Sequence, residues 1–278
     1  MPLSVFAAVL VGAALHASWN AIVKAGSDKV LSAVLVAGGS ALIALPFLFF
    51  LPAPAPESWP FLAASTAVQT LYFILVALAY QATEMSLAYP LMRGSAPVLV
   101  ALASILILGE RIEPAGWFGI ALVSGGVLAI AGAGRARASR SGVAFALANA
   151  CVIATYTLID GVGVRLSGAP VSYALWLFAA NAAPLLAWAI VTRGPALRAY
   201  ARAHARVALI GGAGNLGSYG LALWAMTHAP VALVAALRET SILFGLAIAA
   251  LALGERVDPK RLAAAMLILA GAIGLRLG

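Results

Sequence analysis

Ten apolar runs of about twenty residues follow one another along the chain, separated by short polar connections. A transmembrane helix needs roughly 20 apolar residues, which is the length of each run. The runs are continuous and rich in Ala and Leu, whereas β-barrel strands alternate apolar and polar positions. The sequence therefore predicts an all-α membrane protein with ten transmembrane helices, near residues 3–23, 30–51, 58–80, 84–109, 112–132, 142–165, 170–192, 207–226, 229–254 and 258–277.

The composition excludes a water-soluble protein. Of the 278 residues, 64% are hydrophobic and only 9% are charged, whereas charged residues make up about a quarter of a soluble domain. Ten spans use nearly the whole length, so the sequence predicts a single membrane domain and no soluble enzyme. The expected partners are the lipid bilayer and a small molecule, not nucleic acid. The oligomeric state is left open, a monomer included.

The positive charge gathers in one set of connections. Twelve of the 17 Lys and Arg residues lie in the connections after predicted helices 1, 3, 5, 7 and 9, and only three lie on the opposite side. Cytoplasmic loops of membrane proteins carry an excess of Lys and Arg. We therefore expect a multi-pass protein of the plasma (inner) membrane with both termini outside. Cys151, the single cysteine, excludes an internal disulfide and is expected to be buried.

The chain matches itself at an offset of 145 residues. The offset aligns Arg93 with Arg238, the Gly-Glu-Arg triplets 109–111 and 254–256, Pro114 with Pro259, and Gly126 with Gly271. We therefore expect two five-helix repeats, residues 1–134 and 141–278. Because five is odd, the second repeat must enter the membrane from the opposite side. Inverted repeats of this kind enclose a central substrate cavity in many secondary transporters.

The residues also resemble a known family over essentially the whole chain. Each half has a helix that ends in Gly-Glu, a short acidic-Pro turn and a Gly-containing last helix, and the first span closes with Trp19, Asn20 and Lys24. The fourth helix contains Pro97, whose counterpart in the second half is Ile242. This layout is similar to the EamA-type drug/metabolite transporter family. The resemblance implies a transporter, and amino-acid exporters of the YddG type, including aromatic ones, share the layout; other members move sugars, nucleosides or other metabolites.

Two arginines lie inside predicted spans. Arg93 and Arg238 are each about nine residues into a helix, ~13 Å deep at 1.5 Å per residue, which is near the middle of the bilayer. Ionisable groups at this depth usually face the bundle interior or a water-filled pathway. We expect either an anchor for a substrate carboxylate or a gating pair. The alternative is a structural role, in which each side chain snorkels or caps a neighbouring helix.

Other polar and aromatic side chains lie at similar depths. His16 and Asn20 are four residues apart and share one helix face with Trp19 beside them. Polar groups inside a membrane need partners, so several of them should converge on a cavity while others only join helices. The remaining candidates for substrate binding are Gln69, Tyr72, Tyr89, Tyr156, Asn215 and Tyr219.

Coupling and gating require groups that change state. Glu239, Asp160 and His16 are the candidates for proton coupling. Asp160 could equally be the partner of an arginine, a cation site or a residue close to a loop. Pro90 and Pro97 predict a bent or broken helix beside Arg93.

Further sequence features concern the helix boundaries and other functions. Glu110 and Glu255 are expected to make helix-end or gate contacts. The stretch Gly212–Gly217 fits GxGxxG but lies in an apolar span, where small residues allow close helix packing.

No ATPase or intramembrane-protease motif is present, so we expect no enzyme and no cofactor or metal. A gradient-driven transporter is the main hypothesis, most consistent with amino-acid export. A sugar, nucleoside or drug transporter, a channel and a non-transporting membrane subunit are the alternatives.

Overall fold

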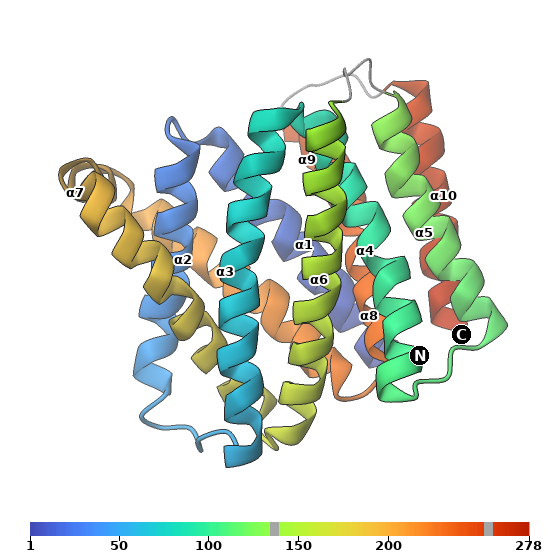
Figure 1. Ribbon diagram of the computed structural model, residues 1–278, viewed down its shortest axis with the longest axis horizontal. Coiled ribbons are helices and arrows are strands. Elements are labelled where there is room, and N and C mark those ends of the chain that lie inside the picture. The colour runs from blue at the N-terminus through green and yellow to red at the C-terminus, as the bar shows by residue number, and fades with distance from the viewer. Residues whose placement is uncertain (134–138, 253–257, 278) are drawn as a thin grey trace.

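The computed structural model describes residues 1–133, 139–252 and 258–277, and within these ranges every regular element is helical. Figure 1 shows the helices side by side in a bundle. Their bounds are α1 Leu3–Ala25, α2 Lys29–Phe47, the short 3-10 helix η1 Pro56–Ser58, α3 Trp59–Ala82, α4 Met85–Leu108, α5 Pro114–Ala133, α6 Arg140–Leu166, α7 Pro170–Met226, α8 Val231–Arg238, α9 Ser241–Ala252 and α10 Pro259–Leu277.

Seven helical segments in the described part of the chain are long and apolar enough to cross a membrane. One of these is the single segment 231–251, which combines α8 and most of α9. Another is α7, whose 57 residues would extend ~86 Å if the helix were straight, far more than one bilayer crossing requires. Helix α5 is also apolar, but its apolar stretch, Pro114–Ile130, is shorter than the seven candidate spans.

Helix α7 departs from the predicted boundaries. The sequence predicts separate helices 170–192 and 207–226, but the residues that connect them are also helical, and α7 runs through all three segments. Arg193 and His204 have non-helical φ/ψ values and bend the chain at both ends of this connecting segment. The segment is rich in Ala and Arg, which favour helix formation. Figure 1 shows α7 folding back on itself beside α2.

The chain is interrupted between α8 and α9 and not in α4, where the prolines lie. Helix α4 runs without interruption through Pro90 and Pro97, so a broken helix beside Arg93 is wrong, whereas a bend there stays a prediction. The second half of the chain has the interruption instead, at Glu239 and Thr240, between α8 and α9. The N–H groups of these two residues donate to carbonyls only three residues earlier, and the Thr240 hydroxyl also donates to Leu237 O. This tight turn separates the helix predicted at 229–254 into two parts.

Glycines hold α5 and α10 together along one edge of the bundle (Figure 1). A Cβ atom added at Gly126 would lie 2.9 Å from Ala264 O, and one added at Gly271 would lie 2.8 Å from Gly119 O. Small residues at such a contact let two helix backbones approach closely. Gly126 and Gly271, which the 145-residue offset aligns, therefore lie at the same helix contact.

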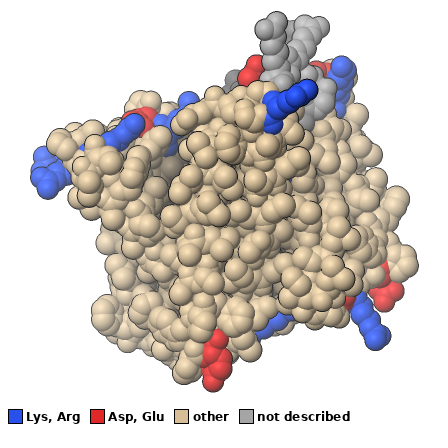
Figure 2. Space-filling model, viewed as in Figure 1, with Lys and Arg blue, Asp and Glu red and all other residues tan. Residues whose placement is uncertain are grey.

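Both termini lie at one face of the molecule. Arg276 Nη1 donates to Met1 O at 2.6 Å, and Figure 1 shows the two ends at the lower right. The ends of α1 and α3 and the bends of α7 lie at the opposite face. Figure 2 shows most of the visible Lys and Arg side chains along that opposite edge and a broad uncharged surface between the two faces. Cys151 is exposed on α6, so its predicted burial is wrong.

Candidate functional site

One cavity of about 190 Å³ lies inside the bundle. Side chains from α1, α2, α3, α4, α6, α7 and α8 line it, so residues from both halves of the chain contribute. The structure brings all eleven candidates for substrate binding to this cavity: His16, Trp19, Asn20, Gln69, Tyr72, Tyr89, Arg93, Tyr156, Asn215, Tyr219 and Arg238. Whether they bind a substrate stays a prediction.

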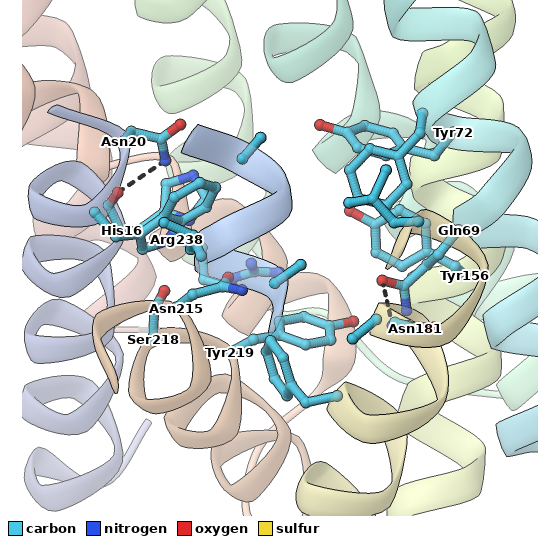
Figure 3. A pocket seen from close by; sticks show the side chains of 18 of the residues that line it. His16, Asn20, Gln69, Tyr72, Tyr156, Asn181, Asn215, Ser218, Tyr219 and Arg238 are labelled. Atoms are coloured by element: carbon cyan, nitrogen blue, oxygen red, sulfur yellow. Dashed lines mark hydrogen bonds between the residues drawn. The ribbon is translucent and has the colours of Figure 1, made fainter. Parts of the chain in front are cut away.

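The polar lining is divided between two walls. Figure 3 shows His16, Asn20 and Arg238 on one side of the cavity, with Asn215 and Ser218 below them, and Gln69, Tyr72, Tyr156 and Asn181 on the other. On the first wall Asn20 Nδ2 donates to His16 O at 2.8 Å, which fixes the amide along α1. The rings of His16 and Trp19 meet edge to face with centroids 5.1 Å apart.

Aromatic rings cover much of the second wall and the base. Tyr72 contacts Tyr156, which in turn contacts Tyr219, with ring centroids 6.0 and 6.4 Å apart. Phe178 also meets Tyr219 at 6.4 Å. Edge-to-face packing of this kind is favourable between aromatic rings. The cavity therefore combines an apolar aromatic surface with a few hydrogen-bonding groups.

The two membrane arginines have different surroundings. Arg93 on α4 makes a two-point ion pair with Glu239, the residue at the break between α8 and α9: Nε to Oε2 is 2.9 Å and Nη2 to Oε1 is 2.8 Å. Only 9% of the Arg93 side chain and 4% of the Glu239 side chain are exposed. The ion pair joins the two halves of the chain, and it uses both Glu239 oxygens.

Arg238 forms no salt bridge within the described ranges. Its guanidinium lies over the Tyr219 ring, 4.5 Å from the ring centroid, which is a cation–π contact. The residue lines the cavity and is partly exposed. Of the two arginines that the 145-residue offset aligns, Arg238 therefore has the guanidinium that a ligand can pair with.

Asp160 lies on α6 beneath the cavity lining and is fully buried. Its Oδ2 accepts hydrogen bonds from the Tyr219 hydroxyl at 2.6 Å and from Gln69 Nε2 at 3.3 Å, and its Oδ1 accepts one from the Tyr173 hydroxyl at 3.2 Å. Within the described part of the chain no arginine forms a salt bridge with it, and its role stays a prediction. Two of its three donors, Tyr219 and Gln69, line the cavity.

Several cavity residues were not predicted from the sequence, most importantly Asn181 and Ser218. Asn181 lies in the apolar run 173–189, and the depth criterion that selected Asn215 would have selected it too. Its Nδ2 donates to Gln69 Oε1 at 2.9 Å. Asn181 Oδ1 and Trp19 Nε1 are buried and have no hydrogen-bond partner among the described residues. Phe73, Phe178 and Leu185 carried no comparable signal, because apolar residues at membrane depth are common.

A polar contact joins the helices at the face where the termini lie. Glu110 Oε1 accepts from Arg165 Nη2 at 2.8 Å and from the Val231 N–H at 2.9 Å, at the start of α8. Arg165 Nε also donates to Met226 O. Glu110 therefore makes a helix-end contact between the two halves of the chain. Its counterpart in the offset, Glu255, lies outside the described residues.

The two prolines of α4 lie differently with respect to the cavities. Pro97 lines a second, much smaller cavity together with Arg93 and Glu239, whereas Pro90 is buried in α4 and lines neither cavity. The described residues contain no group of three or more His, Cys, Asp or Glu side chains that could hold a metal ion.

Comparisons with known proteins give one family and one fold. The sequence model of the EamA-like transporter family matches residues 3–132 and again residues 140–277. A solved structure described only as "Crystal structure of protein" is similar to this chain, with a TM-score of 0.76 and 20% sequence identity, and the match covers 100% of this chain and 98% of that one. At this identity the likeness shows the fold alone. No curated protein matches the sequence.

Proposed function

The chain belongs to the EamA-like transporter family, and we propose that it is a gradient-driven transporter that moves a small metabolite by alternating access. In this proposal ten spans form two inverted five-helix repeats, residues 1–134 and 141–278. The two separate family matches support the duplication. The contact between α5 and α10, which contains the aligned residues Gly126 and Gly271, supports a symmetric arrangement of the halves. Inverted repeats of this kind carry their substrate site at the interface between the halves.

The observation that carries the proposal is the cavity that both halves line. Its volume, about 190 Å³, is below the roughly 300–1,000 Å³ of sites for drug-sized ligands, so a smaller metabolite suits it better. The lining residues of α1, α2 and α4 lie toward the ends joined at residues 25–29 and 82–85. The Glu110–Arg165 contact lies at the opposite face. This is the arrangement expected of a carrier that is open toward its basic face and closed at the other.

Amino-acid export is the substrate proposal. A carboxylate can pair with the Arg238 guanidinium in the two-point geometry that arginine favours. The aromatic surface around Tyr72, Tyr156 and Phe178 would accept side chains of varied size, aromatic ones included. A sugar, nucleoside or drug substrate would leave Arg238 without an anionic partner. A non-transporting membrane subunit would not require a polar cavity lined by both halves.

Counterflow in proteoliposomes tests the function directly. Vesicles loaded with unlabelled L-phenylalanine should accumulate external labelled L-phenylalanine, because a carrier exchanges substrate faster than it dissipates the gradient. A panel of other amino acids, a hexose and a nucleoside establishes the substrate class. Counterflow of the hexose or nucleoside alone would replace amino-acid export with the second candidate. Absence of counterflow with every compound would favour the non-transporting subunit.

Orientation has a separate test. We expect the basic face to be cytoplasmic, so Ala203→Cys, an exposed position on α7 between Arg202 and His204, should not react with a membrane-impermeant maleimide added to intact cells. Glu57→Cys is the matched control and should react, because Glu57 is exposed in η1, directly before α3, whose start lies at the opposite face (Figure 1). Both variants need Cys151 replaced, since that cysteine is exposed. Labelling at position 203 without labelling at position 57 would reverse the orientation.

A further inference from the structure

The connecting segment of α7, residues 193–206, carries positive charge that no acidic residue of its own balances. Its charged residues are Arg193, Arg198, Arg202 and Arg206, and it contains no Asp or Glu. Arg193 pairs with Asp28, but the other three arginines are exposed and form no salt bridge within the described residues. Figure 2 shows basic side chains at the upper left, where Figure 1 places the bends of α7. We call Arg198, Arg202 and Arg206 the α7 arginine cluster.

Packing against α2 holds this segment with its arginines outward. Leu197 is buried in a small apolar cluster with residues of α2, and the hydroxyl groups of Tyr200 and Ser32 are hydrogen bonded at 2.9 Å. Arg198 and Arg202 are four residues apart, so they share one helix face, and both are exposed. The segment therefore presents two arginines side by side, and the third follows the second bend.

Exposed apolar side chains flank the arginine cluster on both arms of α7. Ile190 and Val191 precede the first bend, and Leu209 and Ile210 follow the second. Val191 is 84% exposed and Ile210 65%, and exposed apolar surface on a membrane protein is where lipid contacts it. Trp188 is also exposed on the first arm, as aromatic residues at the membrane–water interface often are. The boundary between the acyl chains and the headgroups therefore lies next to the cluster.

We propose that the α7 arginine cluster binds the headgroup phosphate of an anionic phospholipid, whose acyl chains lie against the two arms of α7. Guanidinium groups pair well with phosphate, and basic clusters at a membrane surface attract anionic lipids. A soluble anion would pair with the arginines but would leave the adjoining apolar surface unused. The lining of the central cavity includes none of the three arginines, so the lipid site is separate from it and does not depend on the substrate.

Lipid binding to the purified whole chain tests the site. The probes are dioleoylphosphatidylglycerol and dioleoylphosphatidylcholine, which have the same acyl chains and differ in net charge. Each is titrated onto the protein in detergent, and bound lipid is counted by native mass spectrometry. Phosphatidylglycerol should bind more tightly to the parent protein. Arg198→Gln/Arg202→Gln should weaken phosphatidylglycerol binding about fivefold for each arginine removed, and should leave phosphatidylcholine binding within about twofold.

Lys260→Gln/Arg261→Gln is the matched control for charge. It removes the same charge from exposed residues at the start of α10, at the same basic face (Figure 1). There the exposed Asp258 offsets part of the positive charge, so phosphatidylglycerol binding should change by less than about twofold. Arg198→Lys/Arg202→Lys keeps both charges and should retain most of the preference for phosphatidylglycerol.

Two further measurements separate a lipid from a soluble anion. Val191→Ser/Ile210→Ser should weaken the binding of both lipids by a similar factor, because it removes apolar contact and no charge. Inorganic phosphate should displace no more phosphatidylglycerol than chloride does at equal ionic strength, because it has no acyl chains.

Three results would overturn the inference. Equal losses in the two Gln double variants would mean that phosphatidylglycerol responds only to the overall charge of the protein. An unchanged preference in Arg198→Gln/Arg202→Gln would place the lipid elsewhere, and displacement by inorganic phosphate would make the cluster a site for a soluble anion. Both arginines are exposed and without a salt bridge in the described residues, so thermal unfolding of the variant should match that of the parent protein. Arg198→Gln alone makes the same test with half the charge change.

Discussion

Replacing Arg238 with Gln should abolish most amino-acid counterflow, because it removes the guanidinium in the cavity that has no salt bridge within the described residues. Losing one partner of a buried charge pair costs about 2–5 kcal/mol, which is a roughly 30-fold or larger increase in the half-saturating substrate concentration. The measurement is the initial rate of labelled L-phenylalanine counterflow over a range of external concentrations. The bundle should survive the change, since the Arg238 guanidinium contacts the Tyr219 ring and forms no salt bridge within the described residues.

Arg238→Lys is the control for charge. A lysine keeps the positive charge but cannot reproduce the two parallel hydrogen bonds of a guanidinium with a carboxylate. We expect intermediate affinity, between that of the parent protein and that of Arg238→Gln. Thermal unfolding of the same preparations in detergent should show little change. Counterflow that persists undiminished in Arg238→Gln would mean that the carboxylate binds elsewhere and that this arginine has a structural role.

The sequence located the helices and the cavity residues because both follow from the cost of placing polar groups in lipid. Apolar runs of the right length predicted the positions of most helices to within a few residues. Polar residues deep in those runs had to find partners, and the eleven selected on that ground lie around one cavity. Asn181 was omitted although it met the same criterion, and it lines the same cavity.

The partners of individual side chains could not be predicted. The ion pair between Arg93 and Glu239 depends on how α4 and α8 are rotated about their own axes, and no local pattern specifies this across 146 positions. The break at Glu239 and Thr240 was also hidden, since neither residue is Pro or Gly. The Thr240 hydroxyl bonds to Leu237 O and competes with helical hydrogen bonding there. In α4, by contrast, the surrounding helices hold a continuous helix despite two prolines.

The ion pair between Arg93 and Glu239 predicts a large effect on stability. Either Arg93→Met or Glu239→Leu leaves one buried charge without its partner, and the cost of this is about 3–5 kcal/mol. Replacing both together by apolar side chains of similar volume removes both charges, and such double replacements are often neutral or stabilising. The double variant should therefore be more stable than either single variant. The measurement is the free energy of unfolding in mixed micelles for all four proteins of a double-mutant cycle.

The pair Arg193–Asp28 is the matched control for this cycle. It joins a bend of α7 to the start of α2 at 3.1 Å, but 44% and 36% of the two side chains are exposed. Exposed ion pairs contribute about 0–1 kcal/mol, so its coupling energy should be several times smaller. Equal coupling in the two cycles would contradict the buried assignment. It would also imply that the Arg93 guanidinium is hydrated and as accessible to a substrate carboxylate as that of Arg238. The two aligned arginines would then not differ in role, one in an ion pair and the other in substrate binding.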